Sequence, residues 1–91
     1  MSKEQIRKEI SKYLINTDEQ HPIPLVDILL ESEAQGLSTL EMPTVESIFQ
    51  IPGEGIIYVN IEYCDEPIEI EDLSKEDMQK ILDYLDNYYN Y

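Results

Sequence analysis

Apolar positions near the start of the chain recur at the spacing of an α-helix. They fall at the first position and then four, seven and eight residues later: Ile6, Ile10, Tyr13 and Leu14. Ser2 followed three residues later by Gln5 matches the capping box, in which each side chain bonds the backbone N–H of the other residue. The pattern therefore predicts a helix that begins near Lys3.

A second apolar run, over residues 25–35, fits two interpretations. Pro24 suits the first turn of a helix and Gly36 suits the position after a helix end, so a second helix is predicted over this range. The rival is a short strand at Ile23–Ile28, because a short apolar run fits either period.

The next three apolar segments alternate at the period of two that is typical of β-strands. Strands are predicted at Val45–Ile51, Ile56–Cys64 and Ile68–Glu71, with turn signals at Pro52–Gly55 and Asp65–Pro67 between them. The central strand carries one apolar row, at its odd positions: Ile57, Val59, Ile61 and Tyr63. Because the connections are short, neighbouring strands are predicted to run antiparallel, as a meander.

The last segment has a well-marked helix start. Ser74 is the predicted N-cap, with Asp77 at the third helical position and Leu73 placed to pack against Met78. The predicted core stripe of this helix repeats at helical spacing: Met78, Ile81, Leu82, Leu85 and Tyr89.

These elements predict a small α+β fold in a single domain over residues 1–91. A three-stranded antiparallel meander packs against about three helices, in the order helix, helix, strand, strand, strand, helix. Helices must cover one sheet face to bury the odd-numbered row of the central strand. The other face is expected to be open and to display these side chains: Glu46, Ile48, Tyr58, Asn60, Glu62, Glu69 and Glu71.

The charge pattern indicates a class of partner. The formal net charge is -14 over 91 residues, and the stretch 13–74 contains 14 of the 20 Asp and Glu but neither Lys nor Arg. A surface with one sign of charge repels nucleic-acid and membrane phosphates and attracts basic proteins. We therefore expect a basic partner protein, no direct nucleic-acid binding and no membrane association.

No motif for catalysis, a cofactor or a metal ion is present in the sequence. The segment 65–72 holds five carboxylates, but alternating positions in an extended chain line charges up rather than bring them to one point. His21 and Cys64 have no companion residues that would make a catalytic site. The acidic segment is either a docking surface or a solvated edge that deters strand-to-strand aggregation.

Two function classes follow from these features. The first is a non-enzymatic binding or inhibitor module that docks a basic partner, in the way that small acidic antirestriction, antitoxin and nuclease-immunity proteins imitate phosphates; this analogy rests on charge and size alone. The second is an accessory or structural subunit with an apolar interface, whose acidity serves solubility. The single cysteine favours a reducing cytoplasm. The predicted partner-binding residues are Tyr58, Glu62, Asp65, Glu66, Glu69 and Glu71.

Overall fold

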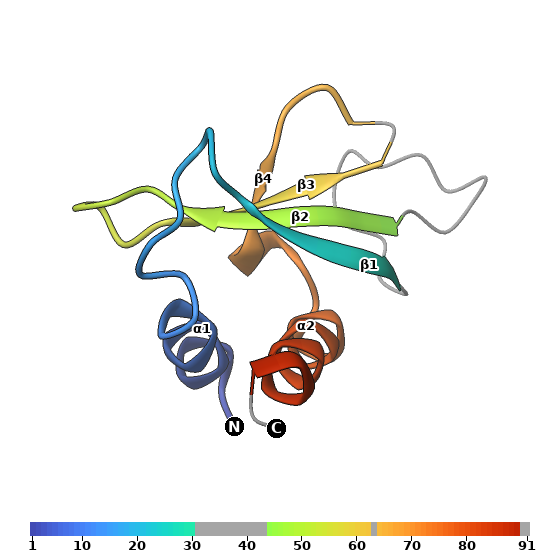
Figure 1. Ribbon diagram of the computed structural model, residues 1–91. Coiled ribbons are helices and arrows are strands. Elements are labelled where there is room, and N and C mark those ends of the chain that lie inside the picture. The colour runs from blue at the N-terminus through green and yellow to red at the C-terminus, as the bar shows by residue number, and fades with distance from the viewer. Residues whose placement is uncertain (31–43, 63, 90–91) are drawn as a thin grey trace.

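Two helices cover one face of an antiparallel sheet in the computed structural model, which describes residues 1–30, 44–62 and 64–89 (Figure 1). The elements follow one another along the chain: α1 (Lys3–Ser11), β1 (Ile23–Leu29), β2 (Thr44–Gln50), β3 (Ile57–Ile61), β4 (Ile68–Glu69), a 3₁₀ turn η1 (Ile70–Asp72) and α2 (Lys75–Tyr89). The predicted α+β class is confirmed.

The sheet is a meander. Its spatial order among the described residues is β1-β2-β3-β4, and each strand runs antiparallel to the next. The predicted antiparallel meander is therefore confirmed. The described part of the chain contains four strands and two α-helices rather than the three strands and about three helices that were predicted.

The difference in element count arises from the second apolar run. The helix predicted over residues 25–35 is wrong for its first part, because Ile23–Leu29 forms β1 against β2; residues 31–35 lie outside the described residues. Prolines favour this outcome, since the residue before a proline prefers extended backbone. Pro24 also lacks an N–H to donate, which suits a strand at a sheet edge.

A bulge in β2 decides which of its side chains face the core. Val45 lies opposite Ile61 and Ile48 lies opposite Val59, but the register shifts between Val45 and Ser47. The bulge thus places two residues that are three apart on the same face. Ile48 is fully buried, so its predicted place on the open face is wrong.

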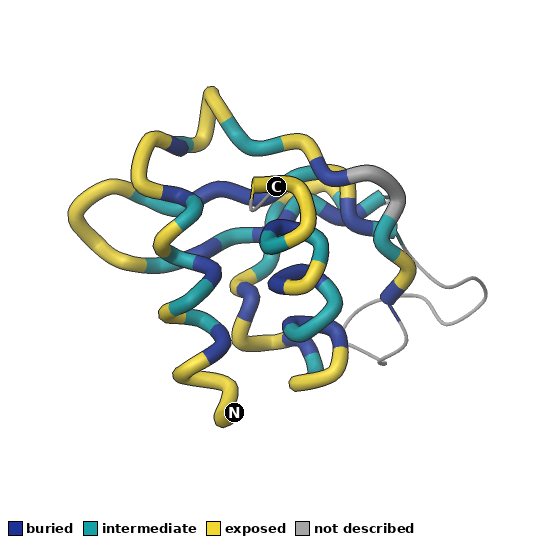
Figure 2. The backbone as a smooth tube through the Cα atoms, turned by 60° about the horizontal axis from the view of Figure 1, so that its bottom comes forward, coloured by how far each residue is buried: buried dark blue, intermediate teal, exposed yellow. Residues whose placement is uncertain are grey.

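One continuous core fills the space between the sheet and the helices. Three members of the odd-numbered row predicted for the central strand are buried as expected, at Ile57, Val59 and Ile61, and the fourth, Tyr63, lies outside the described residues. The helices contribute their predicted stripes: Ile6, Ile10, Met78, Ile81, Leu82 and Leu85, with Leu14 just beyond α1. Figure 2 shows the buried positions of both helices among exposed ones along each turn.

The helix caps form as the sequence predicts. In α1 the Ser2 hydroxyl accepts from the Gln5 backbone N–H at 3.2 Å, and the Gln5 side-chain Oε1 accepts from the Ser2 backbone N–H at 2.9 Å. In α2 the Ser74 hydroxyl accepts from the Asp77 N–H at 3.2 Å. The C-terminal end of the α2 stripe departs from the prediction, because Tyr89 is 47% exposed and stacks on Tyr13.

The turn between β2 and β3 depends on glycine. Gly53 and Gly55 have φ angles of 86° and 70°, in the left-handed region that other residues rarely adopt. Residues 52–55 are all exposed, so this turn stands out from the body of the sheet (Figure 2).

Leu82→Ala should reduce the free energy of unfolding by about 2–5 kcal/mol, because it leaves a cavity in the core where Leu82 is 2% exposed. Chemical denaturation monitored by circular dichroism measures the change. Asn87→Ala, at an exposed position on the same helix, is the matched control. A loss below about 0.5 kcal/mol for Leu82→Ala, the range of surface substitutions, would contradict the burial of this face.

Ser74→Ala should cost about 0.5–2 kcal/mol, because it removes the acceptor for the Asp77 N–H at the start of α2. The denaturation midpoint reports this loss. Ser74→Asp, which keeps a capping acceptor, should retain most of the stability. Equal losses in the two variants would show that capping is not what Ser74 contributes.

Candidate partner-binding surface

The side of the sheet away from α1 and α2 forms a surface that we call the open face (Figure 1). Cross-strand partners on this side are set by the register, since directly opposed residues in antiparallel strands project to the same face. The open face comprises Ser47, Phe49, Tyr58, Asn60, Glu62 and Glu69.

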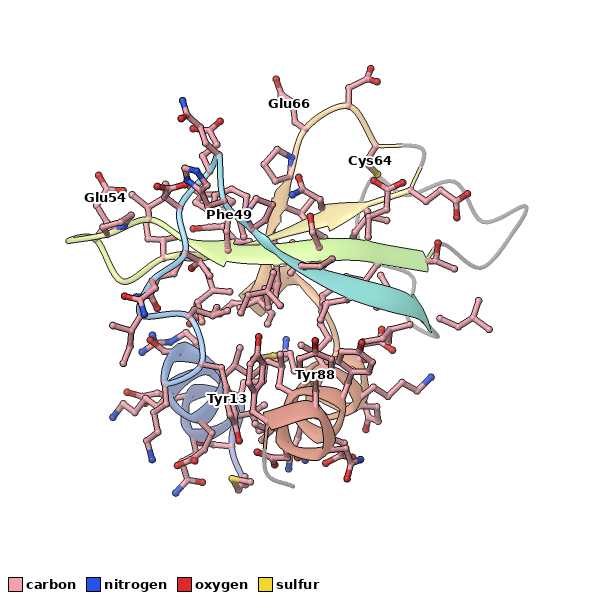
Figure 3. All side chains as sticks on the ribbon, viewed as in Figure 1. Tyr13, Phe49, Glu54, Cys64, Glu66 and Tyr88 are labelled. Atoms are coloured by element: carbon pink, nitrogen blue, oxygen red, sulfur yellow. The ribbon has the colours of Figure 1, made fainter. Side chains whose placement is uncertain are left out.

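An aromatic pair occupies the middle of the open face. Phe49 lies opposite Tyr58, and their rings stack with centroids 5.6 Å apart and planes 20° from parallel. Phe49 is only 3% exposed although it lies outside the core cluster, and Figure 3 shows it on the side of the sheet away from the helices. The sequence analysis placed Tyr58 on this face but did not predict the buried Phe49 ring beneath it.

Polar side chains adjoin this aromatic pair and are held by hydrogen bonds. Asn60 Nδ2 donates to Ser47 Oγ at 2.8 Å. The Thr44 hydroxyl donates to the Glu62 carboxylate, next to the backbone bond from the Glu62 N–H to the Thr44 carbonyl at 2.9 Å. Glu62 is consequently half-buried and fixed in position. Its carboxylate lies on a face to which the described residues bring no Lys or Arg.

Three more of the predicted site residues lie on or beside the open face. Glu69 is exposed and lies directly opposite Tyr58. Asp65 and Glu66 are exposed in the loop between β3 and β4, where Figure 3 shows Glu66 extending away from the sheet. The fold therefore brings an aromatic residue and four carboxylates to one side of the molecule.

Glu71 lies elsewhere. The strand predicted to reach Glu71 ends at Glu69, because Ile70–Asp72 forms η1. The Glu71 carboxylate pairs with Arg7 Nε of α1 at 3.0 Å, and its carbonyl accepts from Lys3 Nζ at 3.1 Å. Its charge is thus partly neutralised on the helical side. The expectation that Glu69 and Glu71 share one face of an extended strand is wrong.

The positive and negative charges occupy different layers. Every Lys and Arg belongs to α1, to its C-cap Lys12 or to α2. Lys8 pairs with Glu4 at 3.5 Å and Lys12 with Glu9 at 3.0 Å, so both ion pairs stay within the first helical segment. The helical layer therefore carries the cations, whereas the sheet layer and its loops carry carboxylates.

In the loop between α1 and β1, one carboxylate accepts several hydrogen bonds. The Asp18 carboxylate lies 2.9 Å from His21 Nδ1 and also accepts from the backbone N–H groups of Gln20 and His21. Hydrogen bonding by the His21 side chain is the main reason that the pKa of Asp18 lies below its usual value. Any stability from these bonds is present at neutral pH and is lost as pH falls through that lowered pKa. The His21 side chain is 75% exposed, as expected for a loop residue.

Within the described residues, no group of three or more His, Cys, Asp or Glu side chains is arranged to hold a metal ion. No helix in that part of the chain combines the length and hydropathy needed to cross a membrane. Comparison of the chain with protein-family models, with curated proteins and with solved structures found no match.

Added salt should stabilise the fold, because the sheet-side carboxylates have few cations near them. Raising the ionic strength from about 0.01 M to about 0.15 M shortens the Debye length from about 30 Å to about 8 Å, which screens their repulsion. The melting temperature should therefore rise. Glu69→Gln should raise the melting temperature at low salt, and the increase should be smaller at about 0.15 M because the repulsion is already screened.

Thermal melts of both proteins at the two salt concentrations measure these differences. A melting temperature that falls as salt is added would mean that ion pairs such as Arg7–Glu71 outweigh the repulsion.

Proposed function

We propose that this chain is a non-enzymatic binding or inhibitor module that docks a basic partner protein on its open face, in the cytoplasm. The observation that carries the proposal is the separation of charge between the two layers. With the cations confined to the helical side, the carboxylates of the sheet side act together on an approaching partner.

The composition of the open face supports a protein partner. Protein interfaces commonly have an aromatic centre and a polar rim. Here Tyr58, half-buried and stacked on the buried Phe49, provides the aromatic contact, and Glu62, Glu66 and Glu69 lie around or beside it. Arg or Lys side chains of a partner would pair with these carboxylates and place their aliphatic stems against the Tyr58 ring.

The partner class that fits best is a protein with a basic cleft for nucleic acid. Such a cleft is built to receive a row of phosphates, and fixed carboxylates on a sheet imitate that row. The Glu62 carboxylate is held by Thr44, so part of the charge is pre-organised before binding. Occupation of the cleft would exclude nucleic acid and thereby inhibit the partner.

The test compares two triple variants that lose the same number of charges. The open-face variant carries Glu62→Gln, Glu66→Gln and Glu69→Gln, and the control carries Glu4→Gln, Glu9→Gln and Asp83→Asn on the helical side. A partner is first captured from native cells at low salt and identified, and its affinity for each purified protein is then measured at several salt concentrations.

The open-face variant should bind at least about tenfold more weakly and show a flatter salt dependence, because it loses charges at the interface. The helical-side control should bind like the unaltered chain. Equal losses in both variants would mean that only net charge matters, and wild-type binding by the open-face variant would overturn the proposal.

A second function is favoured by aromatic side chains at the ends of the helices. Tyr88 is 61% exposed and meets Tyr89 edge to face at 4.8 Å, while Tyr89 stacks on Tyr13 at 5.5 Å. Tyrosines of this kind suit an apolar interface of an accessory subunit. Binding that is insensitive to salt and is lost in Tyr88→Ala would identify this surface as the interface instead.

A further inference from the structure

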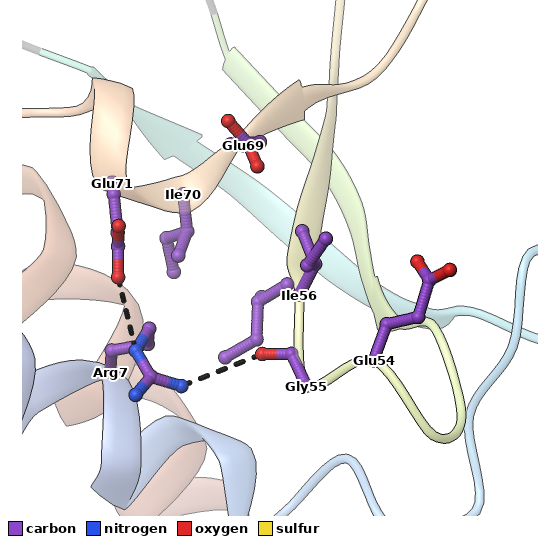
Figure 4. A pocket seen from close by; sticks show the side chains of 8 residues that line it. Arg7, Glu54, Gly55, Ile56, Glu69, Ile70 and Glu71 are labelled. Carbon is purple, nitrogen blue, oxygen red and sulfur yellow. Dashed lines mark hydrogen bonds and ion pairs between the residues drawn. The ribbon is translucent and has the colours of Figure 1, made fainter.

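A pocket lies where β4 separates from β3. The two strands pair only at Val59 with Ile68 and Tyr58 with Glu69, and the chain then turns into η1 towards α1. A cavity of about 380 Å³ lies at this divergence, beside the turn between β2 and β3 (Figure 4). Its volume is at the lower end of the range for ligand sites, so it suits one long side chain rather than a large cofactor.

The wall of the pocket is mixed, and isoleucines form its apolar part. Ile57 and Ile70 are each 1% exposed and belong to the core cluster, so they back the pocket but offer little accessible surface. Ile56 is half-buried and lies in the centre of the view in Figure 4. Methylene groups placed against Ile56 would leave water without opening the core.

The charged groups around the pocket are mainly negative. Glu54, Glu69 and Glu71 line it together with one guanidinium, that of Arg7. The Arg7 side chain is already engaged, by Glu71 at 3.0 Å and by the Gly55 carbonyl at 3.5 Å. The three carboxylates would repel an anionic ligand. A cation on an aliphatic stem would be attracted by them and could pack its methylene groups against Ile56.

We propose that this pocket receives one lysine or arginine side chain of the basic partner. The stem would lie against Ile56, with the cationic end towards Glu69. This inference rests on the proposed function and adds a specific anchor to it, because Glu69 belongs to both the pocket and the open face. Long-range attraction between the charged surfaces would raise the association rate. The fit of one side chain in the pocket would add specificity.

The probe is N-acetyl-lysine methylamide, titrated into the ¹⁵N-labelled protein while backbone amide shifts are followed by NMR. Shifts should saturate at Gly55, Ile56 and Ile70. The norleucine analogue, which has the stem without the charge, should produce no saturable change. The arginine analogue should shift the same amides as the lysine probe.

Two pocket variants and one control sharpen the result. Glu54→Gln combined with Glu69→Gln should weaken lysine binding by roughly fivefold, since it removes two charges near the cation. Ile56→Thr tests the apolar contact, and a thermal melt checks that it folds. Asp83→Asn, at an exposed position on α2 outside the pocket lining, should bind the probe unchanged.

Equal binding of the lysine and norleucine probes, or shifts spread over the open face without saturation, would overturn the pocket assignment. So would an unchanged affinity in the double variant. These outcomes are separable from failure of the proposed function, because Glu62→Gln with Glu66→Gln tests the open face without touching the pocket. If that pair weakens partner binding while Glu54→Gln and Ile56→Thr do not, the docking face stands and the pocket does not.

Discussion

The register between β2 and β3 determines which side chains this protein presents on its open face. A shift of one residue in an antiparallel pair moves every following side chain to the opposite face. The bulge between Val45 and Ser47 makes that shift, so Ile48 enters the core and Phe49 stacks on Tyr58 outside it. The aromatic centre of the open face and the burial of the core row thus depend on the same local irregularity.

The distribution of charge follows from the same two-layer arrangement. Because α1 and α2 cover only one sheet face, the cations of those helices are kept away from the carboxylates of the other face. Mutual repulsion of like charges opposes the compact state, and burial of the continuous core offsets it. An arrangement that costs stability in the isolated chain becomes favourable when a basic partner supplies the missing cations, which is the physical basis of the proposed function.

The candidate site was predicted in part. The alternation of β3 placed Tyr58 and Glu62 on the open face, and the short turn after it brought Glu69 opposite Tyr58. Glu71 could not be placed in this way, because the chain leaves the extended conformation at Ile70 so that Ile70 enters the core. Phe49 was missed for a related reason. The sequence indicates the bulge that turns Phe49 outward only through the spacing of Val45 and Ile48. These two residues are three positions apart, and regular alternation would place them on opposite faces.

The sequence by itself determined the features that depend on near neighbours. Both helix caps, the buried stripes, the alternation of β3 and the sign of the surface charge can all be read from residues a few positions apart. The tertiary structure alone decided that Ile23–Leu29 is a strand, where β2 bulges and where β4 ends. Each of those outcomes depends on which distant segment buries a side chain or bonds a backbone group. A short apolar run satisfies either period until that partner is in place.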